Sequence, residues 1–395
     1  MSLDCSMTPG LPTAKTGAGT AVAWQSSGSA GMNSPVPSQM SAALLVGHGG
    51  LDMLRYRGDV PTPVALAGEV LIRVAAAGVN NTDINTRIGW YSKAVCDATG
   101  AGGIDGFDRI DDADAGWSAA ALDFPRIQGA DCCGRIVAVG DGVDRGRIGE
   151  RVIVRNMLRS PVDYRPYECW TLGSECDGAF AQYVKAPARE THRVECDWSD
   201  AELASIPCSY STAENMLHRA SVGAERVLVT GASGGVGSAA IQLAKRRGAH
   251  VIAVAGAAKA NAVRAIGADE VVDRNADLVS AIGPNSIDAV IDLVAGSSWS
   301  RLLDILRRGG RYATAGAIAG PLVELDVRTL YLKDLTLFGC TFQEDAIFGH
   351  LVSYIERSEI RPLVAKTFPL SEIGRAQEEF LAKGFTGKLV LVPPE

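Results

Sequence analysis

The sequence lacks any long apolar run, and no stretch of it is long enough to span a bilayer as a hydrophobic segment. It also lacks an excess of basic charge: the formal net charge is −7, which argues against nucleic acid or an anionic membrane as a partner. The composition, rich in Ala, Gly and Val, is that of a soluble globular protein. Its 395 residues fit two domains with sizeable cores.

The cysteines lack the arrangement of a disulfide framework. There are nine of them, an odd number. Apart from the neighbours Cys132 and Cys133 they are scattered, with no repeated short spacing. A disulfide-stapled fold is therefore not expected, and a reducing cytoplasm is the expected location.

The first 39 residues lack apolar periodicity. Ser, Gly, Ala, Thr and Pro dominate this stretch, with Trp24 as its only aromatic residue and Lys15 as its only basic one. Such a segment buries too little surface to offset its ordering entropy, so residues 1–39 are expected to be a disordered tail. Their composition matches neither a secretory signal nor an Arg-rich transit peptide.

What the chain does contain is a glycine-rich turn between a strand pattern and a helix pattern. Residues 227–237 read Val-Leu-Val-Thr-Gly-Ala-Ser-Gly-Gly-Val-Gly, and the apolar run at their start predicts a buried parallel strand. Glycines there let the backbone approach a pyrophosphate, and the N–H groups of the following helix favour an anion. We therefore expect a dinucleotide to be bound by Gly231, Ser233, Gly234, Gly235, Val236 and Gly237.

Strand and helix patterns alternate after this turn. A helical pattern near 258–266 is expected, and Gly309 with Gly310 is expected to close the helix before the strand at 311–315. The alternation predicts a parallel sheet with right-handed crossovers. The further strands are expected at 251–255, 270–272, 287–293, 311–315 and 335–338.

The tip of the strand at 251–255 lacks the carboxylate that would bind the ribose hydroxyl of NAD. It reads Ala-Gly-Ala-Ala-Lys up to Lys259, and the next carboxylate is Asp269. Lys259, helped by Arg264, would meet the 2′-phosphate of NADPH as a point charge. We expect NADPH, with NADH the less favoured cofactor. The alternative that Lys259 is only a solvated residue at the start of a helix stays open.

Short strand patterns precede the glycine turn, and they predict a separate, mainly antiparallel, barrel-like domain. After the parallel sheet the chain continues with a helical pattern around 346–357 and ends on a strand at 388–392. This last stretch is too short to fold alone, so we expect it to pack on the first domain. The strands of that domain are expected at 42–46, 70–74, 134–139, 151–154 and 179–184.

Four motifs occur together: the glycine turn, Gly-Val-Asn-Asn-Thr-Asp at 78–83, Pro-Arg-Ile-Gln-Gly at 125–129 and Val-Gly-Asp-Gly-Val at 139–143. With them the chain, from about Met40 onward, resembles the medium-chain dehydrogenase/reductase superfamily. The resemblance implies an α/β fold: a GroES-like β-barrel domain plus a Rossmann domain with a doubly wound parallel sheet. The active site would lie in the cleft between them, and the enzyme would form a homodimer or homotetramer. The implied divisions are a tail at 1–39, a GroES-like catalytic domain at 40–207, a Rossmann domain at 208–342 and a return segment at 343–395.

The metal ligands of the superfamily are not in place. Its zinc alcohol dehydrogenases use a Cys in the motif at 78–83, a His followed by Glu directly after the motif at 125–129, and a Cys before the Rossmann domain. Here those places hold Asn80, then Ala130 with Asp131, and then Cys208. Two good ligands are too few, because catalytic zinc needs three. We therefore expect no zinc, and we expect Cys208 to be a small residue lining the cleft.

The segment after residue 78 is similar instead to zinc-free quinone oxidoreductases and enoyl-thioester reductases. The resemblance implies that Tyr91 is a proton donor or an oxygen-binding hydroxyl, that Asn80 orients substrate or cofactor, and that Thr82 is a nearby hydroxyl. Two alternatives stay open: Tyr91 as a packing aromatic, and Asn80 as a loop residue bonded to its own backbone. Asp83 is expected to accept backbone N–H groups.

Two further features concern the same cleft. Thr212 lies where relatives contact the nicotinamide, although it could equally cap a helix. The chain departs from the superfamily at 96–123, an insertion rich in Gly, Ala and Asp that should lie near the substrate mouth. An acidic lid would oppose a large anionic substrate such as an acyl-CoA. A solvated loop that contacts nothing is the other interpretation.

The sequence thus predicts an NADPH-dependent oxidoreductase with a small-molecule substrate. Hydride would be transferred to a quinone or an α,β-unsaturated carbonyl without a catalytic metal, and hydrogen-bond donors would stabilise the oxygen. One alternative is an alcohol or aldehyde dehydrogenase with an atypical zinc site. The other is a protein that binds NADPH without turnover.

Overall fold

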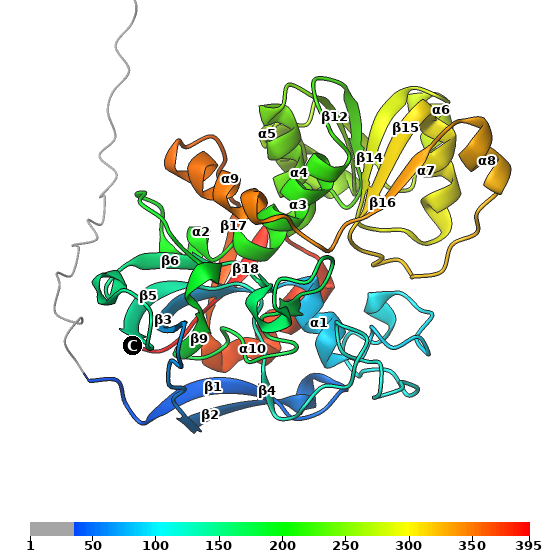
Figure 1. Cartoon of the computed structure of the whole chain (residues 1–395). Helices are drawn as coiled ribbons and strands as arrows, with labels where there is room; N and C mark the ends of the chain where they lie inside the picture. Colours follow the sequence, from blue (N-terminus) through cyan, green and yellow to red (C-terminus); the bar gives the residue numbers. More distant parts are fainter. Residues whose placement is uncertain (1–34) are drawn as a thin grey trace, which may run out of the picture. The chain divides into compact units, whose positions relative to one another are not determined.

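The computed structural model describes residues 35–395. The tail expected at 1–39 therefore lies almost wholly outside the described residues, and the first strand, β1 (Gln39–Leu45), begins at its last position. Residues 36–395 belong to one unit (Figure 1). None of the helices in this part of the chain has the length and apolar character that crossing a membrane requires.

A six-stranded, wholly parallel sheet forms in the second half of the chain, in the order β13-β12-β11-β14-β15-β16 (Figure 1). Its strands are short runs rich in Val, Ile and Ala, as is typical of strands covered on both faces. The expected doubly wound sheet is confirmed. The strands are β11 (Arg226–Val229), β12 (His250–Ala255), β13 (Glu270–Asp273), β14 (Ile287–Asp292), β15 (Leu306–Thr314) and β16 (Thr336–Gly339).

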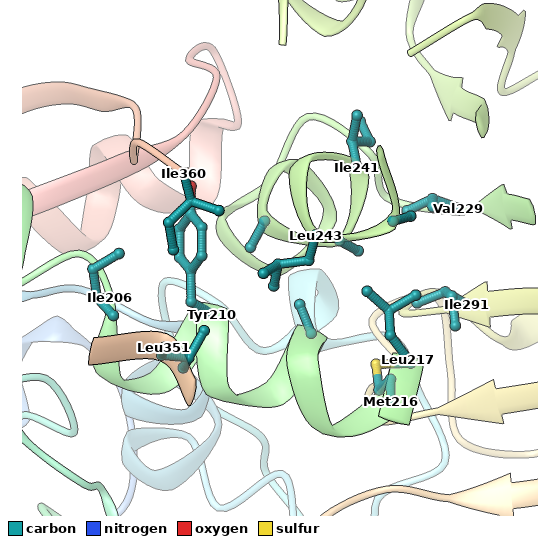
Figure 2. Packing of buried hydrophobic residues seen from close by; sticks show 14 of the residues in the cluster. Ile206, Tyr210, Met216, Leu217, Val229, Ile241, Leu243, Ile291, Leu351 and Ile360 are labelled. Atoms are coloured by element: carbon teal, nitrogen blue, oxygen red, sulfur yellow. The ribbon is translucent and has the colours of Figure 1, made fainter. Parts of the chain in front are cut away.

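Alternate residues of these strands enter two different cores. Val227 and Val229 pack with helices on one face, whereas Leu228 packs with helices on the other. Figure 2 shows the first of these cores, where Leu217 and Leu243 come from two neighbouring helices. The period-2 alternation is what a strand between two helical layers dictates. The first face carries α3 (Pro207–Arg219), α4 (Gly235–Arg246) and α5 (Ala260–Ala265), and the second carries α6 (Leu278–Ile282) and α7 (Trp299–Ile305). Helix α9 (Asp345–Glu356) packs against α3.

The first part of the chain forms short, mostly antiparallel strands around a separate core. Strand β3 is its centre, because it pairs with β5, β9 and β18. The pairing of β18 with β3 brings the end of the chain back to the residues that precede α1 (Asn81–Arg87). The other strands are β2 (Leu54–Pro61), β3 (Glu69–Gly78), β4 (Arg126–Ile127), β5 (Cys133–Val139), β6 (Arg151–Val154), β9 (Tyr183–Pro187), β10 (Thr191–Arg193), β17 (Val364–Pro369) and β18 (Lys388–Val392).

Short elements complete the described chain. A two-stranded sheet pairs β7 with β8, and α10 packs on β17 and β18. These elements are β7 (Met157–Leu158), β8 (Trp170–Thr171), α2 (Asp200–Leu203), α8 (Val327–Leu332) and α10 (Ile373–Ala382).

The helix end expected at Gly309 and Gly310 is wrong. Helix α7 ends at Ile305, and both glycines lie inside β15. The pairing of β15 with β14 shifts register there, so that residues 307–310 form a bulge. Gly309 has a φ of 70°, which a glycine adopts in such a bulge at no steric cost.

The strand expected at 179–184 is also misplaced, since β9 begins only at Tyr183. The backbone N–H groups of Ala179 and Phe180 donate instead to the carbonyls of Gly129 and Gln128. Apolar residues there reflect burial against the loop that opens β5, and not a regular strand.

Candidate functional site

Two cavities meet at the turn between β11 and α4. The first, of about 270 Å³, reaches the start of α1, and we call it the α1 cavity. The second, of about 530 Å³, lies at the carboxyl ends of β12 and β13, and we call it the β12 cavity. Gly231, Gly234 and Gly235 line both. An elongated ligand can therefore run from one to the other across the turn, which is the layout that a dinucleotide requires.

Glycine is required at two positions of this turn. Gly231 has a φ of 58°, and a Cβ atom on Gly237 would lie 2.2 Å from the carbonyl oxygen of Gly231. At Gly234 an added Cβ would have no neighbour nearer than 3.5 Å, so the backbone faces open space there. Since α4 begins at Gly235, its free N–H groups start beside both cavities. These features fit a pyrophosphate.

The remaining residues expected at the turn divide between the cavities. Val236 and Gly237 line the α1 cavity, and Ser233 lines the β12 cavity. The carbonyl oxygen of Ser233 accepts the N–H of Gly387 at 3.0 Å. The segment that leads into β18 thus lies against the glycine turn.

Basic side chains gather around the β12 cavity. Lys259 lines it as expected, and Arg274, Arg301 and Lys383 line it as well. Arg264 is not among the lining residues. Burial lowers the pKa of Lys259, and the positive charge of Arg274 lowers it further. Two cations that repel each other beside a cavity are arranged for an anion between them.

Arg274 was missed by the sequence reasoning, although it follows the end of β13 and so lies at the same sheet edge as Lys259. The cavity wall also includes two carboxylates, and both have donors. The Asp277 carboxylate accepts the N–H of Ser280, and the Asp292 carboxylate accepts the hydroxyls of Thr230 and Tyr312.

Tyr91 and Thr82 meet in the α1 cavity. The Tyr91 hydroxyl lies 2.9 Å from the Thr82 Oγ1 atom, and both residues line the cavity. Burial raises the pKa of Tyr91, so its hydroxyl keeps its proton at neutral pH. Thr212 also lines this cavity, but it lies inside α3 and donates to the carbonyl of Cys208 at 2.7 Å. It is therefore no helix cap.

Asp83 is the third residue of α1 and follows Thr82 in the chain. Its carboxylate accepts the backbone N–H of Asn80 at 2.7 Å and that of Ala130 at 3.3 Å. Burial raises the pKa of Asp83 to about 7, against the lowering effect of these hydrogen bonds. The carboxylate acts as the expected backbone acceptor, and it joins the two motifs that precede α1 and β5.

Both polar atoms of the Asn80 carboxamide form hydrogen bonds inside the protein. Its Oδ1 atom accepts from the ammonium of Lys388 at 2.5 Å, and its Nδ2 atom donates to Asp131 at 2.8 Å. Lys388 in turn donates to Asp131 at 2.7 Å, and the second oxygen of Asp131 accepts the N–H of Cys208 at 2.6 Å. Lys388 was missed by the sequence reasoning. The available signal was a lysine in an otherwise apolar strand, Lys-Leu-Val-Leu-Val, whose apolar residues are almost all buried.

The residues at the place of the superfamily's zinc do not fit a metal ion. Asn80 and Asp131 turn their oxygens toward an ammonium group, which would repel a second cation. Burial and the charge of Asp131 raise the pKa of the Cys208 thiol, which disfavours the thiolate that zinc binds. Among residues 35–395, no three His, Cys, Asp or Glu side chains form a group that could hold a metal.

The insertion at 96–123 contacts the rest of the protein at several points, although most of its residues are exposed, so it is not a loop that contacts nothing. Arg87, which is completely buried, donates to the carbonyls of Gly49 and Gly103 and to Gln377. The N–H of Thr99 donates to the carbonyl of Ile318, which lines the α1 cavity. Trp117, near the end of the insertion, lines the α1 cavity together with Trp90 and Tyr91.

Comparison with known proteins agrees with this geometry. The sequence pattern of the alcohol dehydrogenase GroES-like domain matches residues 66–196, and that of the zinc-binding dehydrogenases matches residues 235–357. A solved structure of a candidate alcohol dehydrogenase from Sinorhizobium meliloti 1021 is 50% identical. It covers 91% of this chain, this chain covers 98% of it, and the TM-score is 0.81. The chain belongs to the medium-chain dehydrogenase/reductase superfamily.

Members with reductase names are also similar. The quinone oxidoreductase of Lama guanicoe is 29% identical over 368 residues, which are 89% of this chain and 97% of that protein. The 2-octenoyl-CoA carboxylase reductase CinF, solved with NADP and 2-octenoyl-CoA, is 25% identical. That alignment covers 91% of this chain and 89% of the other, with a TM-score of 0.76. This medium-chain dehydrogenase/reductase is therefore an oxidoreductase of the quinone oxidoreductase-like type.

Proposed function

We propose that the chain is an NADPH-dependent reductase of quinones or α,β-unsaturated carbonyls that works without a catalytic metal. The observation that carries the proposal is the α1 cavity itself. Beside the glycine turn it presents an ammonium, hydroxyls and aromatic rings, where zinc-dependent members of the superfamily have metal ligands. A polar cavity of this kind suits an electron-poor double bond better than an alcohol, because alcohol oxidation needs a group that acidifies the hydroxyl.

The preference for NADPH is supported by the β12 cavity. Lys259 and Arg274 line the part of this cavity where the ribose of the adenosine half would lie, and the tip of β12, residues 255–259, has no carboxylate of the kind typical of NAD binding. Lys383 adds a third positive charge over the same cavity. CinF, which shares the fold, was solved with NADP. We infer that the 2′-phosphate is bound between Lys259 and Arg274.

When bound, NADPH would supply a hydride to the substrate. The β-carbon of the substrate accepts this hydride with its electron pair, and the carbonyl oxygen becomes an enolate oxygen. A proton then completes the reduction. The Tyr91 hydroxyl is the proposed donor or oxygen-binding group, since it lines the cavity and remains protonated at neutral pH. Thr82 would orient it through their shared hydrogen bond.

Asn80 and Thr212 have supporting positions in this proposal. The Asn80 carboxamide acts through Lys388 and Asp131, to which it is bonded, and Thr212 lines the cavity opposite. Trp90 and Trp117 add flat aromatic walls, which suit a planar neutral ring such as a quinone.

An alcohol or aldehyde dehydrogenase with an atypical zinc site is the second candidate. The 50% identity to a candidate alcohol dehydrogenase favours it. At the usual ligand positions, Cys208 matches the superfamily's Cys and Asp131 replaces its Glu, so these two side chains would be the ligands that remain.

A cofactor-oxidation screen distinguishes the two candidates. Chelator-treated protein is assayed with NADPH and NADH against quinones, enones and aldehydes, and bound zinc is measured by elemental analysis. We expect NADPH oxidation with quinones or enones in metal-free protein. Activity that disappears on chelation and returns with zinc would support the dehydrogenase.

We also propose a homodimer formed through the open edge of the parallel sheet. Within residues 35–395, strand β16 pairs only with β15, and exposed apolar residues occur on it and on the chain that leads into it: Leu322, Val327, Tyr331, Leu332 and Leu337. Light scattering on wild type and Leu337→Lys tests this.

All eight cysteines within 35–395 are free, which fits the cytoplasmic location that we propose.

A further inference from the structure

Lys388 is a buried lysine at the floor of the α1 cavity. It is 3% exposed, and its side chain passes under the glycine turn. A Cβ atom on Gly235 would lie 2.8 Å from its Cδ atom, and one on Gly78 would lie 3.0 Å from its Cε atom. The two glycines therefore leave a channel through which the lysine reaches the start of α1.

The ammonium group ends between two oxygen atoms from separate motifs. It donates to Asn80 at 2.5 Å and to Asp131 at 2.7 Å. An ammonium has three N–H bonds, and residues 35–395 provide acceptors for two of them. The third N–H is left for a ligand, and Lys388 lines the α1 cavity together with Tyr91 and Cys208.

Both acidic and basic groups lie around this ammonium. Asp131 is its direct partner, Asp83 and the thiol of Cys208 lie nearby, and Lys383 is the other cation of the cavity wall. The ion pair of Lys388 with Asp131 is almost completely buried, with side-chain exposures of 4% and 0%. A buried pair of this kind need not add stability, because the desolvation of two charges can exceed their attraction.

We propose that the third N–H of Lys388 binds the carbonyl oxygen of the substrate and so provides the positive charge that a zinc ion provides in metal-dependent members of the superfamily. This rests on the proposed function, and it assigns the electrophile of that reaction. The ammonium keeps its proton. It stabilises the enolate oxygen by a charge-assisted hydrogen bond while the hydride and its electron pair reach the β-carbon. The proton that completes the product comes from Tyr91 or water.

The proposal also explains the residues around the lysine. Asp131 holds the ammonium in place and balances its charge in the absence of substrate. Asn80 fixes the direction of a second N–H bond, so that the third has a defined direction. The position that the superfamily uses for a metal would thus keep its electrostatic role with a different cation.

The test uses three variants of Lys388, one matched control and, for phenol binding, the variant Lys383→Met of the other lysine in the cavity wall. Lys388→Met removes the charge and keeps the length of the side chain, but it leaves Asp131 buried and unpaired, which can prevent folding. The double variant Lys388→Met with Asp131→Asn removes both charges together. Lys388→Arg keeps the charge. Lys366→Met, at an exposed ion pair with Glu379 on β17, controls for the substitution itself.

Two readouts are compared on full-length protein. The first is kcat/KM for a quinone beside the Kd of NADPH. A charged hydrogen bond of about 1.5–3 kcal/mol corresponds to a loss of roughly 10- to 100-fold in kcat/KM, with the NADPH Kd nearly unchanged. The second is binding of 4-nitrophenol, whose anion absorbs visible light. Wild type should favour the anion, whereas the double variant should raise the pKa of the bound phenol by about one unit or more.

Each outcome decides something. A double variant as slow as Lys388→Met, with partial recovery in Lys388→Arg, supports the proposal. Wild-type kcat/KM in the double variant overturns it, because the single variant's defect would then come from the unpaired carboxylate. Loss of phenolate preference in Lys383→Met, with none in the Lys388 variants, also overturns it. Wild type that binds the phenolate through Lys388 but oxidises no NADPH would refute the proposed function and leave the anion site intact.

Discussion

The ammonium of Lys259 donates a hydrogen bond to the carbonyl oxygen of Lys383 across 2.6 Å. This bond joins the connection after β12 to the residue that follows α10, directly over the β12 cavity. Lys383 is in the left-handed region, with a φ of 52°, and that conformation turns its carbonyl toward Lys259. The two lysines thus link the C-terminal segment to the cofactor site.

Cofactor selectivity should depend on this cluster. We expect Lys259→Ala and Arg274→Ala each to weaken the binding of NADPH by about 10- to 100-fold, because each variant loses a charge-assisted contact to the 2′-phosphate. NADH binding should change less than about threefold. Arg264→Ala is the control, since Arg264 lies outside the cavity lining. Kd values from fluorescence titration check this, and equal losses for both cofactors would exclude a phosphate contact.

The residues of the site show how much of it could be predicted from the sequence. Lys259 and the glycine turn were predictable because local order decides them: a strand, a turn and a helix start follow one another along the chain. Arg274 and Lys388 were not, because they reach the site only through the sheet order β13-β12-β11 and through the return of β18 to β3. Neither pairing leaves a local pattern in the sequence.

The insertion and the bulge in β15 illustrate the same limit. A stretch rich in Gly, Ala and Asp resembles a solvated loop, and only the position of the buried Arg87 shows what orders it. Gly309 and Gly310 suggest a helix end, and only the pairing with β14 shows a bulge.

The role of Tyr91 can be separated from cofactor binding. We expect Tyr91→Phe to lower kcat by roughly 10- to 1000-fold, as for the loss of a general acid, while the Kd of NADPH stays within about twofold. Tyr56→Phe, at an exposed position on β2, is the matched control. Single-turnover absorbance at the NADPH band measures the step, and an unchanged rate would remove Tyr91 from the mechanism.

Stability below neutral pH should depend on His192. Burial lowers the pKa of His192 to about 4, helped by the nearby charges of Arg155 and Arg147. The unfolded chain takes up the proton near pH 6.5, so the contribution of neutral His192 is complete above that pH and is lost as the pH falls toward 4.

His192→Gln should remove this dependence. Relative to the variant, wild type should lose on the order of 1–3 kcal/mol of unfolding free energy between neutral pH and pH values near 4. His350→Gln, exposed on α9, is the control. Denaturant titrations at a series of pH values measure the difference, and parallel curves for wild type and His192→Gln would contradict a neutral, half-buried imidazole.

The insertion at 96–123 should loosen when Arg87 is replaced. The side chain of Arg87 is fully buried, and its guanidinium donates hydrogen bonds to Gly103 of the insertion, to Gly49 and to Gln377 of α10. In Arg87→Met the acceptors lose their donors, at a cost of about 1–3 kcal/mol for each one left unsatisfied.

Arg109 is exposed within the insertion, so trypsin should cut after it faster in the Arg87→Met variant, and mass spectrometry identifies the site. Because Trp117 would then be held less firmly in the cavity wall, the KM for a quinone should rise more than the Kd for NADPH. Equal cleavage rates in wild type and variant would mean that the Thr99–Ile318 bond and the packing of the loop hold the insertion without Arg87.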